Sequence, residues 1–286
     1  MRALVYDPAV RHGLRLGEAP DPVPGPRQVL VRIAATSLNF GEVMVTAAAA
    51  DGSGPPVGAR VVTYGWSGGW GELRAVDTTE LAVLPDGVDL GVAAALPVAG
   101  VTALRALRRL GAVVGRRVLI TGASGGVGRF AVQLAARAGA QVVAAVGRPE
   151  RGAGLAELGA SDVVSGGLDG VREPFVGVID NVGGPLLAAA YALLAPGGLA
   201  VSVGKASLEP TTIDFERARL ANAGARIEAF TVGTGFGPDL AYLASLVAAG
   251  ALDPQVGWRG GWERAGEAAE ALLNRQVTGK AVLDVA

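Results

Sequence analysis

The amino-acid sequence predicts an α/β protein in which a compact β domain is joined to a doubly wound parallel sheet of six strands. Three observations predict this class: short apolar runs divided by Pro and Gly before residue 85, alternating strand-like and helix-like segments from 117 to 231, and a glycine-rich turn in mid-chain. With 286 residues, of which 50% are hydrophobic, the chain can bury one large core or two ordinary ones.

The first part of the chain has the composition of strands and turns. Four prolines between 20 and 26 stiffen a connection, because each proline fixes its own φ and restrains the residue before it. From 92 to 110 the spacing becomes helical, interrupted by Pro97 and Gly100. We expect strands at 3–6, 29–34, 59–63 and 72–76.

The middle part alternates apolar strands with segments of helical spacing, which is typical of a parallel sheet. Two helices near 239–249 and 262–273 and a last strand at 280–285 follow it. We expect these elements to return to the first domain, because the edge of a small β domain would otherwise stay open. The six strands of the parallel sheet are expected at 118–121, 141–146, 162–165, 175–180, 199–203 and 226–231.

The most informative motif is the turn that follows the strand at 118–121. The sequence runs Thr-Gly-Ala-Ser-Gly-Gly-Val-Gly through 121–128 and continues with a helical apolar face. Small residues at Ala123, Gly125 and Gly128 let backbone amides approach a pyrophosphate that a larger side chain would hold away. We therefore predict a dinucleotide site whose turn contributes Ser124, Gly125, Gly126 and Val127.

The next strand indicates which dinucleotide binds. A cofactor with a free ribose 2′-hydroxyl is normally held by Asp or Glu about 20 residues beyond the turn. Here the strand ends in Gly147 and Arg148, and Arg151 follows. Guanidinium groups suit a 2′-phosphate, so we predict NADPH, with Arg148 as the better candidate because it is nearest the strand end. The alternative is that both arginines are merely solvated at the start of a helix.

Composition argues against several other partners. A net charge of −1 offers no electrostatic drive towards nucleic acid, and no long apolar run predicts a membrane span. The chain starts directly in a strand-like pattern and has no cysteine, so we expect a cytoplasmic protein. We expect no zinc, because a catalytic zinc needs about three protein ligands and the single histidine, His12, lies in an arginine-rich turn.

Four further segments carry a family resemblance: TSLNFGEV at 36–43, GWGE at 69–72, LPVAGVTA at 96–103 and TGKAVL at 278–283. With the glycine turn, they make the chain resemble the zinc-independent quinone oxidoreductase and enoyl reductase branch of the medium-chain dehydrogenase/reductase superfamily. The resemblance implies a GroES-like catalytic domain at 1–95 and 236–286 and an NADPH-binding Rossmann domain at 96–235. It also implies hydride transfer to a quinone or an α,β-unsaturated carbonyl, and a homodimer formed along the sheet edge at 226–231.

The resemblance also implies roles for single residues. Asn39 matches the asparagine beside the nicotinamide and the carbonyl substrate, and Thr102 matches a threonine that touches the nicotinamide. Tyr64, Lys205 and water are candidate proton sources, none favoured over the others. Alternatively, Asn39 is a turn residue that satisfies its own backbone. Asn181, Val182 and Gly204 would border the nicotinamide ribose, Arg148 or Arg151 would bind the phosphate, and Phe230 would approach the ring or pack in the core.

One departure from the family pattern leaves the substrate open. Between Val43 and Ala59 the family normally carries a longer stretch, with a Pro-Gly-x-Glu motif and a strand that helps to wall the active site. Either the deletion is real and leaves a wide cleft, or residues are absent from this sequence near 46–47. The rival function is an NADPH-binding sensor or structural protein without turnover. A short-chain dehydrogenase is disfavoured, because neither Tyr191 nor Tyr242 is followed by Lys four residues later.

Overall fold

The structure is a computed structural model that describes residues 1–10, 13–38 and 41–285. The chain divides into two compact units. Unit 1 comprises Met1–Val101 together with Gly233–Ala286, and unit 2 comprises Thr102–Val232. The chain therefore leaves unit 1 and returns to it, as the sequence predicts for the last helices and strand.

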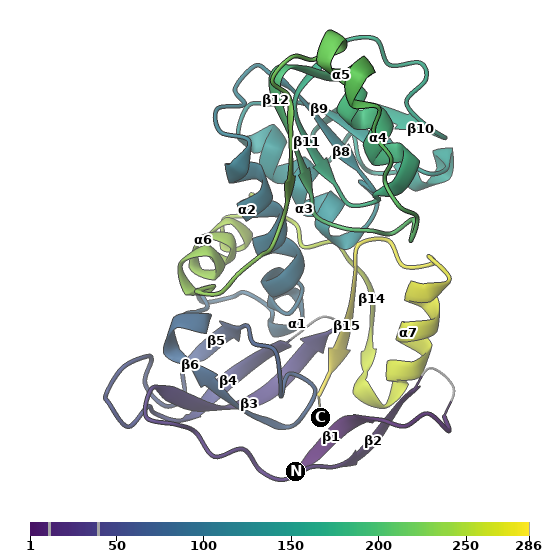
Figure 1. The fold of residues 1–286 in the computed structure, drawn as a ribbon. Coiled ribbons are helices and arrows are strands. Elements are labelled where there is room, and N and C mark those ends of the chain that lie inside the picture. The colour runs from purple at the N-terminus through teal and green to yellow at the C-terminus, as the bar shows by residue number, and fades with distance from the viewer. Residues whose placement is uncertain (11–12, 39–40, 286) are drawn as a thin grey trace. The chain divides into compact units, whose positions relative to one another are not determined.

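Unit 2 is built on a parallel sheet of six strands, as predicted (Figure 1). Its strand order is β10-β9-β8-β11-β12-β13, so the direction of winding reverses between β8 and β11. In such sheets the reversal point is where ligands bind, at the carboxyl ends of the strands. The strands are β8 (Arg117–Thr121), β9 (Gln141–Val146), β10 (Ala160–Ser165), β11 (Phe175–Asp180), β12 (Leu194–Ser202) and β13 (Arg226–Ala229).

Helices cover this sheet and explain its apolar strands. Residues such as Leu119, Val143 and Phe175 are buried, which requires packing on both faces of the sheet. Residues 166–174 join β10 to β11 without a helix. The helices of this part are α2 (Val101–Arg109), α3 (Gly126–Arg137), the 3-10 helix η4 (Pro149–Gly152), α4 (Gly184–Ala192) and α5 (Phe215–Ala221).

Unit 1 contains the sheet β14-β15-β3-β4-β5-β7, with β6 paired to β3 and a separate hairpin β1-β2. The last strand, β15, pairs antiparallel with β3, which confirms the predicted return of the chain end. The strands are β1 (Arg2–Tyr6), β2 (Leu14–Glu18), β3 (Gln28–Ser37), β4 (Gly41–Ala47), β5 (Arg60–Thr63), β6 (Leu73–Asp77), β7 (Leu81–Val83), β14 (Val256–Gly261) and β15 (Lys280–Asp284).

Four strands of unit 1 were not among the sequence predictions: β2, β4, β7 and β14. Strand β7 has only three residues, and glycine weakens the strand signal in β2 and in β14, which contains three glycines within its six residues. Strand β4 includes the start of the segment from Val43 to Ala59, where the family usually carries more chain, and it pairs with β3 and β5. Its run from Val43 to Thr46 favours a strand by composition, and the pairing establishes it.

Apart from α6 (Gly237–Ala248) and α7 (Ala265–Leu273), the helices of unit 1 have five residues or fewer. Pro97 lies in a five-residue π-helix, Leu96–Gly100, which runs directly into α2. The others are α1 (Leu90–Ala93) and the 3-10 helices η2 (Thr78–Glu80) and η5 (Trp262–Arg264). Within the described ranges, no helix has the length and apolar character needed to cross a membrane.

Candidate functional site

The glycine turn lies at the carboxyl end of β8, beside the reversal point of the sheet. Gly122 takes a left-handed φ of +60°, which a side chain rarely allows. The Ala123 N–H donates to the carbonyl of Ala145 at 3.1 Å, which ties the turn to β9. Helix α3 begins at Gly126, and its N-cap residue, Gly125, contributes no side chain. The backbone amides of the first helical turn thus have no capping side chain above them.

Gly128 brings the helix against this turn more closely than any other residue could. A Cβ atom built on Gly128 would lie 2.3 Å from the Gly122 oxygen and 2.6 Å from the Ala123 Cα. A Cβ on Gly125 would meet only the Gly122 oxygen, at 3.4 Å. The two glycines therefore differ: Gly128 is required by packing, whereas Gly125 keeps space open above the helix start. This geometry fits a pyrophosphate bound at a helix N-terminus.

A buried carboxylate joins the ends of β8 and β11. Asp180 is fully buried, and it accepts hydrogen bonds from the Thr121 hydroxyl at 2.5 Å and the Gly183 N–H at 2.8 Å. Burial raises the pKa of the Asp180 carboxyl, and these hydrogen bonds oppose that shift. Its backbone carbonyl accepts from Val203 and Gly204. Asp180 thus links three strand ends at the reversal point, a role that sequence analysis missed.

The predicted ribose-binding residues lie on this framework. Asn181 donates through its side-chain amide to the Thr121 carbonyl at 2.8 Å, so that group already serves to hold the strand ends together. A Cβ on Gly204 would lie 2.7 Å from the Asn181 carbonyl oxygen. Val182 contacts the turn, since a Cβ on Gly122 would lie 3.2 Å from its Cγ2. The structure therefore brings together Asn181, Val182, Gly204 and the glycine turn.

The two predicted arginines have different surroundings. Arg148 forms an ion pair with Glu150 at 3.2 Å, and both side chains are 66% exposed. Arg151 donates from Nε to the Ser124 hydroxyl at 3.1 Å and so lies against the glycine turn. Arg129 of α3 donates to the Ala153 carbonyl at 2.7 Å, which ties the segment carrying these arginines to the helix. A Cβ on Gly147 would have open space around it.

The remaining predicted residues are divided between the two units. Tyr64 belongs to unit 1, where it is 2% exposed and its ring is stacked on that of Phe236. Thr102 belongs to unit 2 and is buried at the start of α2. Phe230 follows β13, is half-buried, and donates its N–H to the Ser202 carbonyl. Asn39 and His12 lie outside the described residues.

The residues present do not fit a zinc site of the usual kind. The sequence has no cysteine and one histidine. In the part of the chain that the structure describes, no group of three or more His, Cys, Asp or Glu side chains could hold a metal ion. Zinc in proteins is bound by such groups, with three or four protein ligands.

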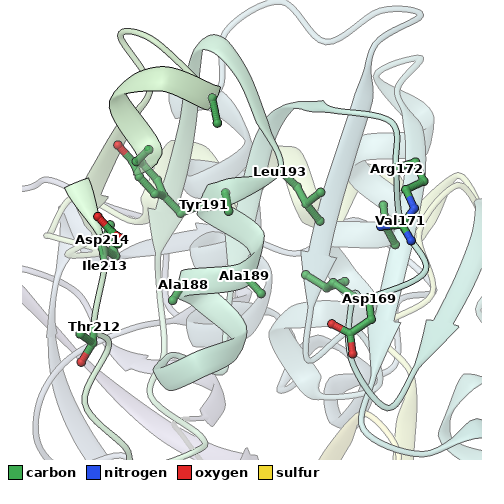
Figure 2. Close-up of a pocket in the computed structure, with 14 residues that line it drawn as sticks. Asp169, Val171, Arg172, Ala188, Ala189, Tyr191, Leu193, Thr212, Ile213 and Asp214 are labelled. Atoms are coloured by element: carbon green, nitrogen blue, oxygen red, sulfur yellow. The ribbon is translucent and has the colours of Figure 1, made fainter. Parts of the chain in front are cut away.

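A separate pocket of about 490 Å³ lies in unit 2 (Figure 2). Ala188 and Ala189 of α4 line it, and in the view they lie between Asp169 and Arg172 on one side and Asp214 on the other. None of the predicted cofactor-binding residues lines it. The pocket borders the connection from β10 to β11, which contains no helix.

Comparisons with known proteins agree with this geometry. Residues 126–249 match the family model described as zinc-binding dehydrogenase. An acrylyl-CoA reductase from Ruegeria pomeroyi is 35% identical over 178 residues, which are 55% of this chain and 54% of that protein. A quinone oxidoreductase from Pseudomonas aeruginosa is 30% identical over 227 residues, 67% of this chain and 69% of that protein. The chain spans about half the length of the first of these relatives.

Solved structures extend the likeness to the whole chain. The quinone oxidoreductase from Coxiella burnetii has a TM-score of 0.85 and 25% identity, and the match covers 100% of this chain and 99% of that one. A mycobacterial quinone oxidoreductase has a TM-score of 0.86 and 26% identity, with 99% of both chains covered. The chain therefore belongs to the medium-chain dehydrogenase/reductase family of oxidoreductases and has quinone oxidoreductases and enoyl reductases as its neighbours.

Proposed function

We propose that this protein transfers a hydride from NADPH to a quinone or an α,β-unsaturated carbonyl without a metal ion. The observation that carries the proposal is the glycine turn, where Gly128 admits only a hydrogen and Arg151 lies against Ser124. The similarity to an acrylyl-CoA reductase and to quinone oxidoreductases supports the class of acceptor. The absence of cysteine and the single histidine support chemistry without zinc.

Each part of the site would have a distinct task. The amides of the first turn of α3 would bind the pyrophosphate, and Asn181, Val182 and Gly204 would position the nicotinamide ribose. Thr102 and Phe230 would limit the position of the ring. When bound, the cofactor supplies a hydride, and a conjugated acceptor is favoured because it spreads the developing negative charge onto an oxygen that hydrogen-bond donors can stabilise. Lys205 is exposed, so Lys205 and water are more accessible proton sources than the buried Tyr64.

The contacts of the two arginines favour Arg151 as the main ligand of the 2′-phosphate. Its guanidinium already lies beside the turn, bonded to Ser124. Arg148 is paired with Glu150, whose carboxylate would repel a phosphate. Arg148 would therefore bind the 2′-phosphate only after its ion pair with Glu150 breaks. We expect its removal to weaken NADPH binding less than the removal of Arg151.

The cofactor assignment predicts a loss of selectivity when the arginines are removed. Arg151→Ala should weaken NADPH binding about 10- to 100-fold, which is typical for losing charged hydrogen bonds, and should change NADH binding little. Arg148→Ala should also weaken NADPH binding, by a smaller factor. Both dissociation constants can be measured by calorimetry. Arg137→Ala, an exposed arginine at the far end of α3, is the control for loss of one positive charge. Unchanged NADPH selectivity in both variants would refute the assignment.

The reaction itself is tested by cofactor oxidation. NADPH absorbance should fall when quinones or enones are added to the protein, and the reduced acceptor should be found in equal amount. The alternative function, an NADPH-binding protein without turnover, predicts tight binding and no oxidation across a broad panel of acceptors. That result would reject the proposed enzymatic activity.

We also propose that unit 2 mediates a homodimer. Strand β13 is an edge of the six-stranded sheet, and exposed edges favour pairing with another chain. Ile227 of this strand is 37% exposed, and the preceding helix α5 carries two exposed apolar side chains, Phe215 at 65% and Leu220 at 90%. Light scattering should give twice the monomer mass, and Ile227→Asp should give a monomer with unchanged unfolding. A monomeric wild-type protein would contradict the proposal.

A further inference from the structure

We propose that a pocket in unit 1, the tryptophan pocket, binds the flat apolar substituent of the electron acceptor; this rests on the proposed function. The pocket has a volume of about 600 Å³, and Trp66, Trp70, Leu38, Leu4 and Met1 are among the residues that line it. Small-molecule sites in proteins typically have this size and mostly apolar or aromatic walls. All of its lining residues belong to unit 1.

One wall is an exposed tryptophan that other aromatic rings hold in place. Trp66 is 72% exposed, and its ring meets that of Tyr64 edge-on, with centroids 5.6 Å apart and planes at 75°. Tyr64 is in turn stacked on Phe236, with centroids 3.6 Å apart and planes at 4°. Because Tyr64 is buried, the ring on which Trp66 packs lies inside the protein. An aromatic side chain has only two rotatable side-chain bonds, so it loses little freedom when a ligand covers it.

The second wall is fixed by hydrogen bonds. Trp70 donates from its indole N–H to the Ser37 carbonyl at 3.3 Å, and its own carbonyl accepts from the Leu4 N–H at 2.8 Å. The loop between the tryptophans is also anchored, because the buried Thr36 hydroxyl donates to the Gly69 carbonyl at 2.9 Å. Trp66 therefore packs on the ring of Tyr64, whereas Trp70 is held by hydrogen bonds with Ser37 and Leu4.

The chemistry of the lining selects the ligand class. None of the described lining side chains carries a charge, and the Met1 amino group is paired with Asp21 at 2.9 Å. Two indole rings and aliphatic side chains favour a flat conjugated ring or an alkyl group over a polar or anionic one. The pocket thus suits an aryl substituent of an enone or the fused ring of a quinone.

The sequence positions of its lining residues indicate that the pocket binds the electron acceptor rather than an unrelated ligand. Leu38, which lines it, immediately precedes Asn39, the residue that the family resemblance places beside the carbonyl substrate. Trp66 contacts Tyr64, the other candidate catalytic residue of unit 1. The pocket thus touches Tyr64 through Trp66 and, through Leu38, is adjacent along the sequence to Asn39. An acceptor bound there would place its apolar end over Trp66.

Two enones that differ by one phenyl group test this inference. At saturating NADPH, wild-type protein should have a higher kcat/KM for benzalacetone than for methyl vinyl ketone. Trp66→Ala should lower the ratio of the two kcat/KM values about tenfold, and Trp66→Phe should recover most of it. Trp258→Phe, which changes a tryptophan outside the pocket, is the matched control and should leave the ratio unchanged. Trp66 is largely exposed, so its replacement should not unfold the protein.

A binding measurement separates failure of the pocket from failure of the proposed reaction. Benzylacetone, the saturated product, cannot be reduced at a double bond, and its dissociation constant can be measured by calorimetry without turnover. Trp66→Ala should weaken its binding about tenfold. Equal binding to wild type and variant, or no binding to either, would overturn the pocket assignment even if both enones are reduced. Reduction of neither enone, with Trp66-dependent binding of benzylacetone, would reject the reaction and retain the pocket.

Discussion

Replacing Gly128 by alanine should abolish detectable NADPH binding, with a dissociation constant raised at least about 100-fold. The added methyl would lie 2.3 Å from the Gly122 oxygen and 2.6 Å from the Ala123 Cα, both of them backbone atoms that cannot rotate away. Helix α3 must therefore move away from the turn, and the amides of its first turn move with it. We expect the same shift to lower the free energy of unfolding by about 1–3 kcal/mol, the usual cost of overpacking.

Calorimetry with NADPH and urea unfolding of the same variant measure the two effects. Gly170→Ala is the matched control, because a Cβ there meets nothing within 4 Å and the backbone does not take a left-handed φ. This control should bind NADPH as the wild type does. If Gly128→Ala bound NADPH normally while folded, the turn would not be the pyrophosphate site.

Asp180→Ala should lower the free energy of unfolding by about 2–4 kcal/mol, because it leaves buried donors without their acceptor. The Thr121 hydroxyl and the Gly183 N–H both lose a hydrogen bond of 2.8 Å or less. The segment from Asn181 to Gly183 then keeps the hydrogen bonds of Asn181 to Thr121 but loses those of the carboxylate, so NADPH affinity should fall by about tenfold. Asp180→Asn should have a free energy of unfolding between those of the wild type and Asp180→Ala. Its side-chain oxygen can still accept one hydrogen bond, but its amide group places a donor where a donor already points.

Urea unfolding and calorimetry again give both quantities for this residue. Asp162→Ala is the control, because this exposed carboxylate on β10 bonds only to the N–H of its neighbour Val163 in the described contacts. A loss of stability no larger than that of the control would show that the Asp180 carboxylate does not hold the strand ends together.

The inner strands of the parallel sheet could be predicted because they are buried on both faces. Such strands appear as apolar runs, and two of them, β9 and β11, begin and end at the predicted residues. The first part of β12 was missed, since Pro196 and Gly197 interrupt the apolar pattern there. Strand β4 was also missed, although Val43, Val45 and Thr46 favour a strand; its pairing with β3 and β5 establishes it.

The candidate site was predictable only where short-range geometry controls it. The glycine turn requires small residues at fixed spacing, and those are visible in the chain. In contrast, the Thr121–Asp180 hydrogen bond and the Ser124–Arg151 contact join residues that are distant along the chain. As the proposed ligand of the 2′-phosphate, Arg148 was favoured by its proximity to the strand end, whereas the contacts in the structure favour Arg151.

By itself, the sequence determined the fold class, the dinucleotide turn and the lack of cysteine ligands, because periodicity, glycine spacing and composition are local properties. Tertiary structure decided which residues meet. It buried Tyr64 under Phe236, engaged Arg148 with Glu150 and left Trp66 exposed over an apolar pocket. These outcomes depend on packing between segments far apart along the chain, and the free energy of such contacts is not encoded in any single local window.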